Sequence, residues 1–173
     1  MRVAAQAEEA SAKPAEAVAD PLDGAFTVRK IYEDGRHNAF TGATTWKNRF
    51  FVTFRNADNH LSFDGKIKVL AADTRGEAFT EQATISAPGK DLRDPKVVNA
   101  GEKLFIYAGA VDEADQKRRM TEARLYSSAD GRRWQQEPLT GLYPGSWLWF
   151  VCRSGDRFYG SAYCRARAGE PMR

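Results

Sequence analysis

The chain repeats one pattern of hydrophobic and polar positions three times: an apolar strand, a short polar turn and a second strand rich in aromatic residues. The three copies are Phe40 to Phe54, Pro95 to Gly109 and Trp149 to Tyr163. Their turns contain Asn48, Glu102 and Asp156, which are spaced 54 residues apart. A polar turn between two apolar segments of strand length predicts a β-hairpin at each position.

A third apolar segment follows each of the first two hairpins, at Ile67 to Ala71 and at Ala123 to Ser127. Each is followed by a turn that contains a glycine, Gly76 or Gly131, and ends in an aromatic residue. A period near 50 residues, with three or four short strands per unit and little helical periodicity, is typical of β-propeller blades. A β-sandwich also has many short strands, but it does not require the same turn at a constant spacing. The pattern therefore predicts an all-β propeller.

About three blades fit between residues 23 and 173, whereas propellers typically close with four to eight. We therefore expect a piece of a longer protein, because an open ring exposes a strand edge that proteins usually cover. Assembly of several chains into one ring is the alternative. Residues 1–22 contain many Ala and Glu residues and no aromatic residue, which predicts a flexible leader. Within them we find no continuous apolar segment of the kind that a cleavable signal peptide needs.

The composition argues against several classes of function. With 42% hydrophobic and 12% aromatic residues, the chain can build a sizeable core. Its formal net charge of +3 comes from charges mixed along the sequence, so nucleic acid is not an expected partner. No apolar segment is long enough to predict a membrane span. We expect no metal and no cofactor, and we expect the two cysteines, Cys152 and Cys164, to be buried thiols that do not face each other.

The segment Ser128-Ala129-Asp130-Gly131-Arg132-Arg133-Trp134 resembles the Asp-box turn of sialidases and related propellers. It is one residue short between Asp and Gly, and it lacks the usual Thr. In such a turn the Asp carboxylate accepts backbone N–H groups, Gly supplies a positive φ, and the aromatic ring packs beneath the sheet. Residues 73–79 form a degenerate second copy. The motif is an argument for the fold and lies away from the expected active site.

The first unit resembles the first blade of sialidases. This resemblance implies that Arg36 binds the carboxylate of the substrate, that Arg55 supplies a second basic contact, and that Asp64 is the acid/base carboxylate. Guanidinium groups suit this role because they are always charged and bind a carboxylate in bidentate fashion. Sialidases usually have Arg-Ile-Pro where this chain has Arg36-His37-Asn38, and we include His37 and Asn38 among the substrate-binding candidates. A turn carboxylate at Asp64 and solvated positions for the two arginines are the structural alternatives.

The second unit opens with Asp91-Leu92-Arg93-Asp94-Pro95-Lys96. Its Arg-Asp-Pro resembles the five-bladed furanosidases that act on fructosides and arabinosides, and this implies that Asp94 stabilises an oxocarbenium-like transition state. The first unit lacks the Asn-Asp-Pro segment of those families, and no Glu in the third unit fits their general acid. The structural alternative is an ion pair between Arg93 and Asp94 where the strand begins.

The third unit begins with an aromatic run in which strict alternation places Trp147 and Trp149 on one face, and Leu148 and Phe150 on the other. Trp149 is therefore a candidate for stacking on a sugar ring, with packing between blades as the alternative. Because each residue precedes or closes an inner strand, we also expect five candidates to lie at the same end of the blades. These are His37, Asn38, Asp64, Arg93 and Asp94.

Together these features predict a fragment of a six-bladed, sialidase-like glycoside hydrolase with a glycan as its partner. In that family the nucleophilic Tyr and its Glu come from later blades, so we expect this chain alone to be inactive. The family implies an extracellular or periplasmic location. A furanosidase-type glycosidase and a non-catalytic carbohydrate-binding propeller are the alternative functions.

Overall fold

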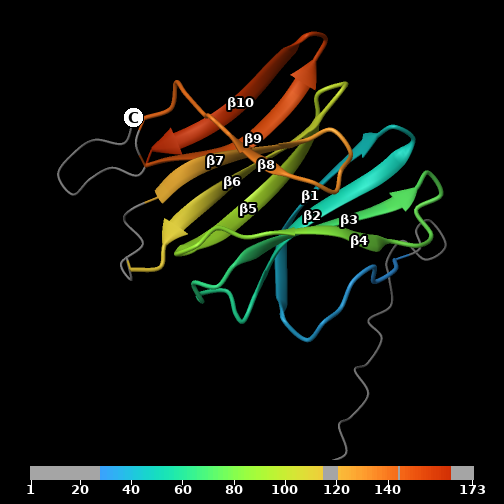
Figure 1. The fold of residues 1–173 in the computed structure, drawn as a ribbon, viewed down its shortest axis with the longest axis horizontal. Helices are drawn as coiled ribbons and strands as arrows, with labels where there is room; N and C mark the ends of the chain where they lie inside the picture. The colour runs from blue at the N-terminus through green and yellow to red at the C-terminus, as the bar shows by residue number, and fades with distance from the viewer. Residues whose placement is uncertain (1–27, 115–120, 144, 165–173) are drawn as a thin grey trace, which may run out of the picture. The chain divides into compact units, whose positions relative to one another are not determined.

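The computed structural model describes residues 28–114, 121–143 and 145–164, and the leader predicted for residues 1–22 lies outside them. The chain divides into two units at Lys30, and all the strands belong to the second unit. These strands form three antiparallel sheets (Figure 1). The described residues contain no helix, so none of them forms a helix that could cross a membrane.

Each sheet follows the chain as a meander, so that neighbours in sequence pair with one another. The first blade consists of β1 (His37–Trp46), β2 (Arg49–Ala57), β3 (Lys66–Asp73) and β4 (Thr80–Ile85). The second blade consists of β5 (Lys90–Asn99), β6 (Leu104–Asp112), β7 (Thr121–Ser128) and β8 (Gln135–Glu137). The third contributes one hairpin, β9 (Ser146–Ser154) and β10 (Arg157–Cys164). The three predicted hairpins and the two predicted third strands are confirmed.

The hairpin turns have the backbone geometry that their residues predict. Lys47 and Asn48 both have a positive φ, 47° and 56°, and Trp46 lies opposite Arg49. A two-residue turn of this kind matches the right-handed twist of the strands on either side. The turn at Gly155 in the third hairpin is equally short, so each inner strand returns directly along its neighbour.

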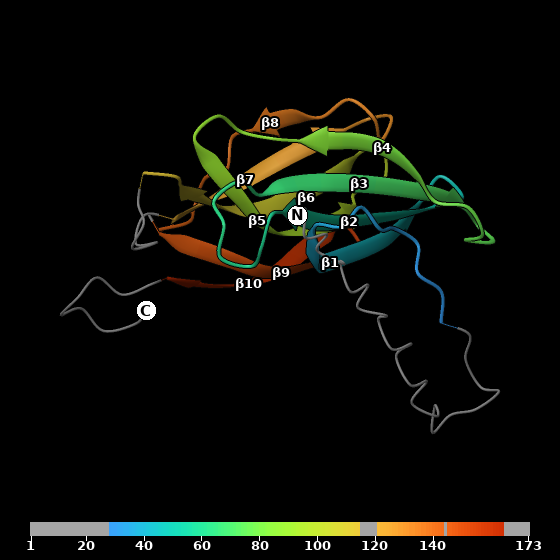
Figure 2. The same ribbon diagram turned by 90° about the horizontal axis from the view of Figure 1, so that it is seen from below.

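The first two blades pack face to face around one hydrophobic core. From the first blade it contains Trp46, Phe51, Ile67 and Val69. From the second it contains Leu92, Leu104, Ile106 and Tyr126. The inner strands β1 and β5 lie side by side, and the inner strand β9 contacts β5 in turn (Figures 1 and 2).

Hydrogen bonds between the first two blades follow the sequence repeat. Asn99 Nδ2 donates to Thr45 O at 2.7 Å, across 54 residues, and Trp46 Nε1 donates to Gly101 O, across 55. Four-stranded meanders with their inner strands side by side are propeller blades. The chain thus holds two complete blades and the inner hairpin of a third, and the six-bladed ring stays a prediction.

The third hairpin departs from the predicted register because its strand pairing shifts at Trp149. Cys152 faces Tyr159 as expected, but beyond the shift Cys164 lies opposite Ser146 instead of Trp147. The strict alternation expected for the aromatic run is interrupted at the same residue. Cys152 is exposed and Cys164 is half-buried, so the prediction of two buried thiols is wrong.

The core between the blades predicts a contrast between two adjacent phenylalanines of β2. Phe51 is fully buried and packs against Trp46 with ring centroids 5.8 Å apart, whereas Phe50 is 37% exposed. We expect Phe51→Ala to lower the free energy of unfolding by about 3–5 kcal/mol, the usual cost of truncating a buried phenylalanine. Phe50→Ala is the matched control and should cost much less. Urea unfolding measures both, and equal losses would contradict this packing.

Candidate functional site

Each inner strand carries a β-bulge at the same point of the repeat. The pairing shifts at Phe40-Thr41 in β1, at Asp94-Pro95 in β5 and at Trp149 in β9. Phe40 and Asp94, 54 residues apart, have positive φ values of 61° and 50°, which are uncommon for residues other than glycine. Bulges redirect side chains and are frequent beside active sites. They mark this end of the inner strands as the candidate site.

One carboxylate at this end binds arginines from two blades. Asp91 in β5 and Arg55 in β2 are fully buried, and Arg55 Nε and Nη2 lie 3.0 and 2.9 Å from Asp91 Oδ1. Arg93 Nε donates to the other carboxylate oxygen of Asp91 at 2.5 Å. Burying these charges costs desolvation free energy, which is offset only when the remaining donors also find partners.

The remaining donors of both arginines hold the loop between β2 and β3. Arg55 Nη1 donates to Asn59 O at 3.1 Å, and Arg55 Nη2 donates to Ser62 O at 2.8 Å. From the second blade, Arg93 Nη2 donates to His60 O at 3.2 Å and to Ser62 O at 3.1 Å. The buried network thus fixes the backbone of a loop from the first blade onto the start of β5.

Gly65 ends this loop in direct contact with the network. Its N–H donates to Asp91 Oδ1 at 3.2 Å, and its carbonyl accepts from the Leu92 N–H at 3.0 Å. A Cβ at this position would lie only 2.0 Å from Asp91 Oδ1 and 2.6 Å from Arg55 Nε. Glycine is therefore required here by the close approach of the side chains.

The first residues of β1 lie against the same loop. The ring of His60 is 5.5 Å from that of His37 and 5.5 Å from that of Phe40, measured between centroids. His37 Nδ1 is buried and has no hydrogen-bond partner among the described residues. Asn38 Oδ1 accepts from Asn56 Nδ2 at 2.7 Å. These contacts place His37 and Asn38 at the candidate site.

Arg36 and Asp64 form a second, more exposed group of charges. Arg36 Nη2 donates to Asp64 Oδ2 at 2.5 Å, and Arg36 Nη1 lies 2.7 Å from Asp58 Oδ1. Burial raises the pKa of Asp64, but hydrogen bonds from Ser62, the Asp58 N–H and Arg36 outweigh it and lower the pKa to about 2. Asp64 is therefore ionised at neutral pH and holds no proton to give to a leaving group.

Asp94 has the opposite electrostatic character. Only 9% of it is exposed, and burial raises its pKa in spite of the positive charges of Lys96 and Arg93. The buried charges of Arg55, Arg93, Asp91 and Asp94 balance when Asp94 is ionised. A carboxyl with a raised pKa in a bulge with positive φ is a strong functional candidate.

The prediction that His37, Asn38, Asp64, Arg93 and Asp94 lie at one end of the blades is confirmed, because all five surround the β2–β3 loop or the start of β5. Arg36 and Arg55 join them there. Their roles toward a substrate stay predictions, and every one of the arginines is already bound to an Asp.

Trp149 stands at the equivalent bulge of the third blade. It lies on β9 with 54% of its surface exposed, and its ring centroid is 6.2 Å from that of Tyr163. Its role as a sugar platform also stays a prediction.

The sequence does not mark Asp91 and His60 as site residues, although Asp91 opens the charged motif before Pro95.

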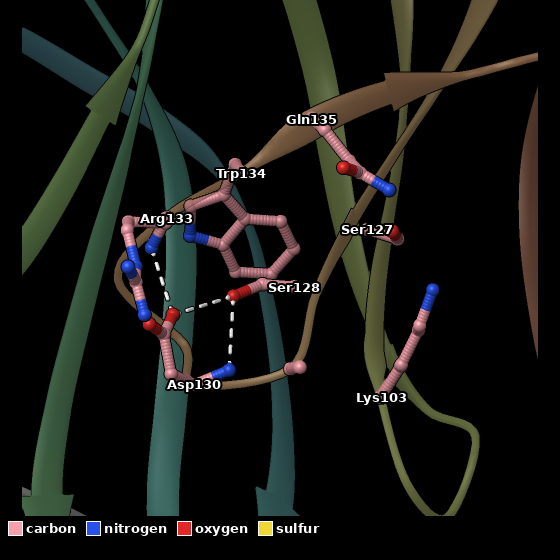
Figure 3. A pocket seen from close by; sticks show the side chains of 8 residues that line it. Lys103, Ser127, Ser128, Asp130, Arg133, Trp134 and Gln135 are labelled. Carbon is pink, nitrogen blue, oxygen red and sulfur yellow. Dashed lines mark hydrogen bonds and ion pairs between the residues drawn. The ribbon is translucent and has the colours of Figure 1, made fainter.

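A hollow of about 470 Å³ lies elsewhere, at the turn after β7 (Figure 3). Asp130 Oδ1 in this turn accepts the backbone N–H groups of Arg132 and Arg133 at 2.9 and 2.8 Å, and Gly131 has a φ of 74°. These bonds hold the pKa of Asp130 well below its usual range. The turn has the internal bonding predicted for it, and the Asp130 carboxylate is occupied in maintaining the turn.

No family model and no curated protein matches the chain. Among solved structures, the GH43_1 enzyme from Xanthomonas citri complexed with xylotriose is similar, with 14% identity and a TM-score of 0.50, over 62% of this chain and 34% of that one. The GH93 α-L-arabinofuranosidase of Fusarium graminearum with arabinobiose gives 12% identity and a TM-score of 0.50, over 72% of this chain and 38% of that one. The chain therefore has the β-propeller fold of these glycoside hydrolases and spans about a third of their length.

The buried network predicts that Asp91 is critical for stability. Asp91→Asn removes the charge that neutralises Arg55 and Arg93, so we expect a loss of about 3–5 kcal/mol in the free energy of unfolding. Asp73→Asn, which removes an exposed pair with Arg75, is the control and should change little. Urea unfolding at neutral pH distinguishes them, and a small effect at Asp91 would show that the network does not hold the fold.

The pKa of Asp64 predicts a dependence of stability on pH. Since the folded pKa of about 2 lies below the ordinary value of 3.8, ionised Asp64 stabilises the fold above about pH 4, and this stabilisation is lost as the pH falls through about 2. The difference in unfolding free energy between the wild type and Asp64→Asn should therefore be constant near neutral pH and shrink between about pH 4 and pH 2. Urea unfolding at a series of pH values tests this, and a difference that does not vary with pH would refute it.

Proposed function

We propose that this chain supplies the glycan-binding end of a glycoside-hydrolase propeller and that Asp94 is the carboxylate facing the sugar. The observation that carries this proposal is the combination of burial, raised pKa and positive φ at Asp94. A carboxylate beside the anomeric carbon can stabilise the positive charge that develops when a glycosidic bond breaks.

A neutral sugar fits this end of the blades better than an acidic one. Binding a substrate carboxylate calls for a guanidinium with free donors, but Arg36, Arg55 and Arg93 are each bound to an Asp. A sialic acid carboxylate would have to compete with these aspartates for the guanidinium groups. The observation favours the furanosidase-type or xylosidase-type function over the sialidase type.

The solved structures give independent support to a neutral sugar. One similar enzyme was crystallised with xylotriose and another with arabinobiose, and both ligands are neutral oligosaccharides of pentoses. Because this chain spans about a third of their length, the complete activity belongs to the proposal. A carbohydrate-binding propeller without catalysis shares the same site and differs only in turnover.

A binding experiment tests the choice of sugar. We expect arabinobiose or xylotriose to shift amide resonances around the β2–β3 loop and the start of β5 in NMR titrations, and sialyllactose to shift none. Asp94→Asn should weaken the affinity for the pentose oligosaccharide by about tenfold, equivalent to about 1.4 kcal/mol, whereas the control Asp73→Asn should leave it unchanged. Binding of sialyllactose that depends on Arg36 would favour the sialidase function.

Turnover separates an enzyme from a binding module. A 4-nitrophenyl arabinofuranoside and a 4-nitrophenyl xyloside serve as substrates, assayed with and without Asp94→Asn. Hydrolysis that Asp94→Asn abolishes would support catalysis at this site. Because we expect this chain alone to be inactive, the assay also needs a chain that carries the complete ring of blades. Binding without hydrolysis by that longer chain would favour the carbohydrate-binding function.

A further inference from the structure

Trp147 of the third blade is packed flat against the backbone of the second. Only 8% of its surface is exposed, and it lies against Gly109 of β6. A Cβ at Gly109 would lie 2.5 Å from the indole Cη2 atom. The absence of a side chain at Gly109 thus creates the space that the indole fills, so the ring position is fixed from both blades.

The indole N–H of Trp147 is the unusual part of this contact. It is buried, and no described residue accepts a hydrogen bond from it within normal geometry. A buried donor without an acceptor is unfavourable, so such groups nearly always have a partner or a specific function. Gly109 pairs with Arg93, the residue before Asp94, so the indole that covers Gly109 lies beside the Asp94 bulge. In keeping with this position, the indole N–H lowers the pKa of the Asp94 carboxyl, although burial raises it more.

The groups around Asp94 come from three strands. Arg93 and Lys96 belong to β5 itself, Arg55 comes from β2, and Trp147 comes from β9. The two arginines already donate to Asp91, and Lys96 Nζ donates to Thr41 O at 2.8 Å. Among these four side chains, the indole is the one whose N–H has no acceptor among the described residues.

We propose that Trp147 is a positioning residue for Asp94, whose carboxylate accepts the indole N–H and is thereby held in one orientation in its bulge. A hydrogen bond to a charged acceptor is shorter and stronger than one between neutral groups, so ionised Asp94 is a better acceptor for this N–H than a neutral group would be. The third blade then orients the carboxylate of the second. This proposal relies on the proposed function only for the contact between Asp94 and the sugar.

Two other roles for Trp147 fit the structure less well. A sugar platform needs an exposed ring face, which Trp149 has and Trp147 lacks, since their exposed fractions are 54% and 8%. Pure packing between blades needs only an aromatic ring, and phenylalanine would supply it. The N–H group therefore distinguishes positioning from packing in an experiment.

The test is an NMR titration of the intact chain. In the wild type, the indole ¹H–¹⁵N resonance of Trp147 should shift with pH at the pKa of Asp94, as followed by the ¹³C resonance of that carboxyl. In Asp94→Asn this shift should vanish. An indole resonance that does not shift when Asp94 ionises would overturn the proposal. The comparison of the wild type with Asp94→Asn leaves Trp147 unchanged.

A variant of the donor gives a second readout. Trp147→Phe keeps a ring against Gly109 but removes the N–H, and because a donor to the charged form lowers a pKa, the pKa of Asp94 should rise. Trp149→Phe, on the same strand but exposed, is the matched control and should leave it unchanged. An unchanged pKa in folded Trp147→Phe would contradict positioning. If the hydrogen bond between Trp147 and Asp94 is found but Asp94→Asn binds glycans normally, the proposed function fails and this inference stands.

Discussion

The candidate site depends on one buried carboxylate that neutralises arginines from two blades. Asp91 lies at the start of β5 and binds Arg55 of β2 and Arg93 of its own strand. All three side chains lie within the interface between the blades. The donors left over hold the β2–β3 loop by its carbonyl oxygens. The β2–β3 loop, the start of β5 and the interface between the blades therefore depend on one another, because none of these charges can be buried without the others.

The same repeat produces different chemistry in each blade. The bulge position holds Phe40 in the first blade and Asp94 in the second, 54 residues later, and Leu148 stands another 54 residues on. Only the second of these positions carries a carboxyl, and it lies beside the arginine network that offsets its charge. A backbone strained alike in two blades has thus become a candidate site where the side chain and its surroundings allow one.

The sequence was sufficient to predict the blades but only part of the site. The hairpins, their turns and the third strands follow from local patterns that repeat, and the gathering of His37, Asp64 and Asp94 at one end follows from their places in that repeat. The burial of Arg55 was not predictable, because its partner Asp91 is 36 residues away and the pairing exists only when two blades pack. The bulge in β9 was missed as well, since an extra residue in a strand leaves no mark in a pattern of hydrophobic positions. For that reason the register of Cys164 was wrong by one residue.

Hydrogen exchange at the Gly65 amide tests most directly whether the Asp91 network organises this end of the blades. Gly65 lies outside the strands, yet its N–H donates to the buried Asp91 carboxylate. The account predicts that this amide exchanges as slowly as that of Val69 in the core strand β3. Exchange as fast as that of Gly101, whose amide lies in the exposed β5–β6 turn, would show that the loop opens freely and that the network does not hold it.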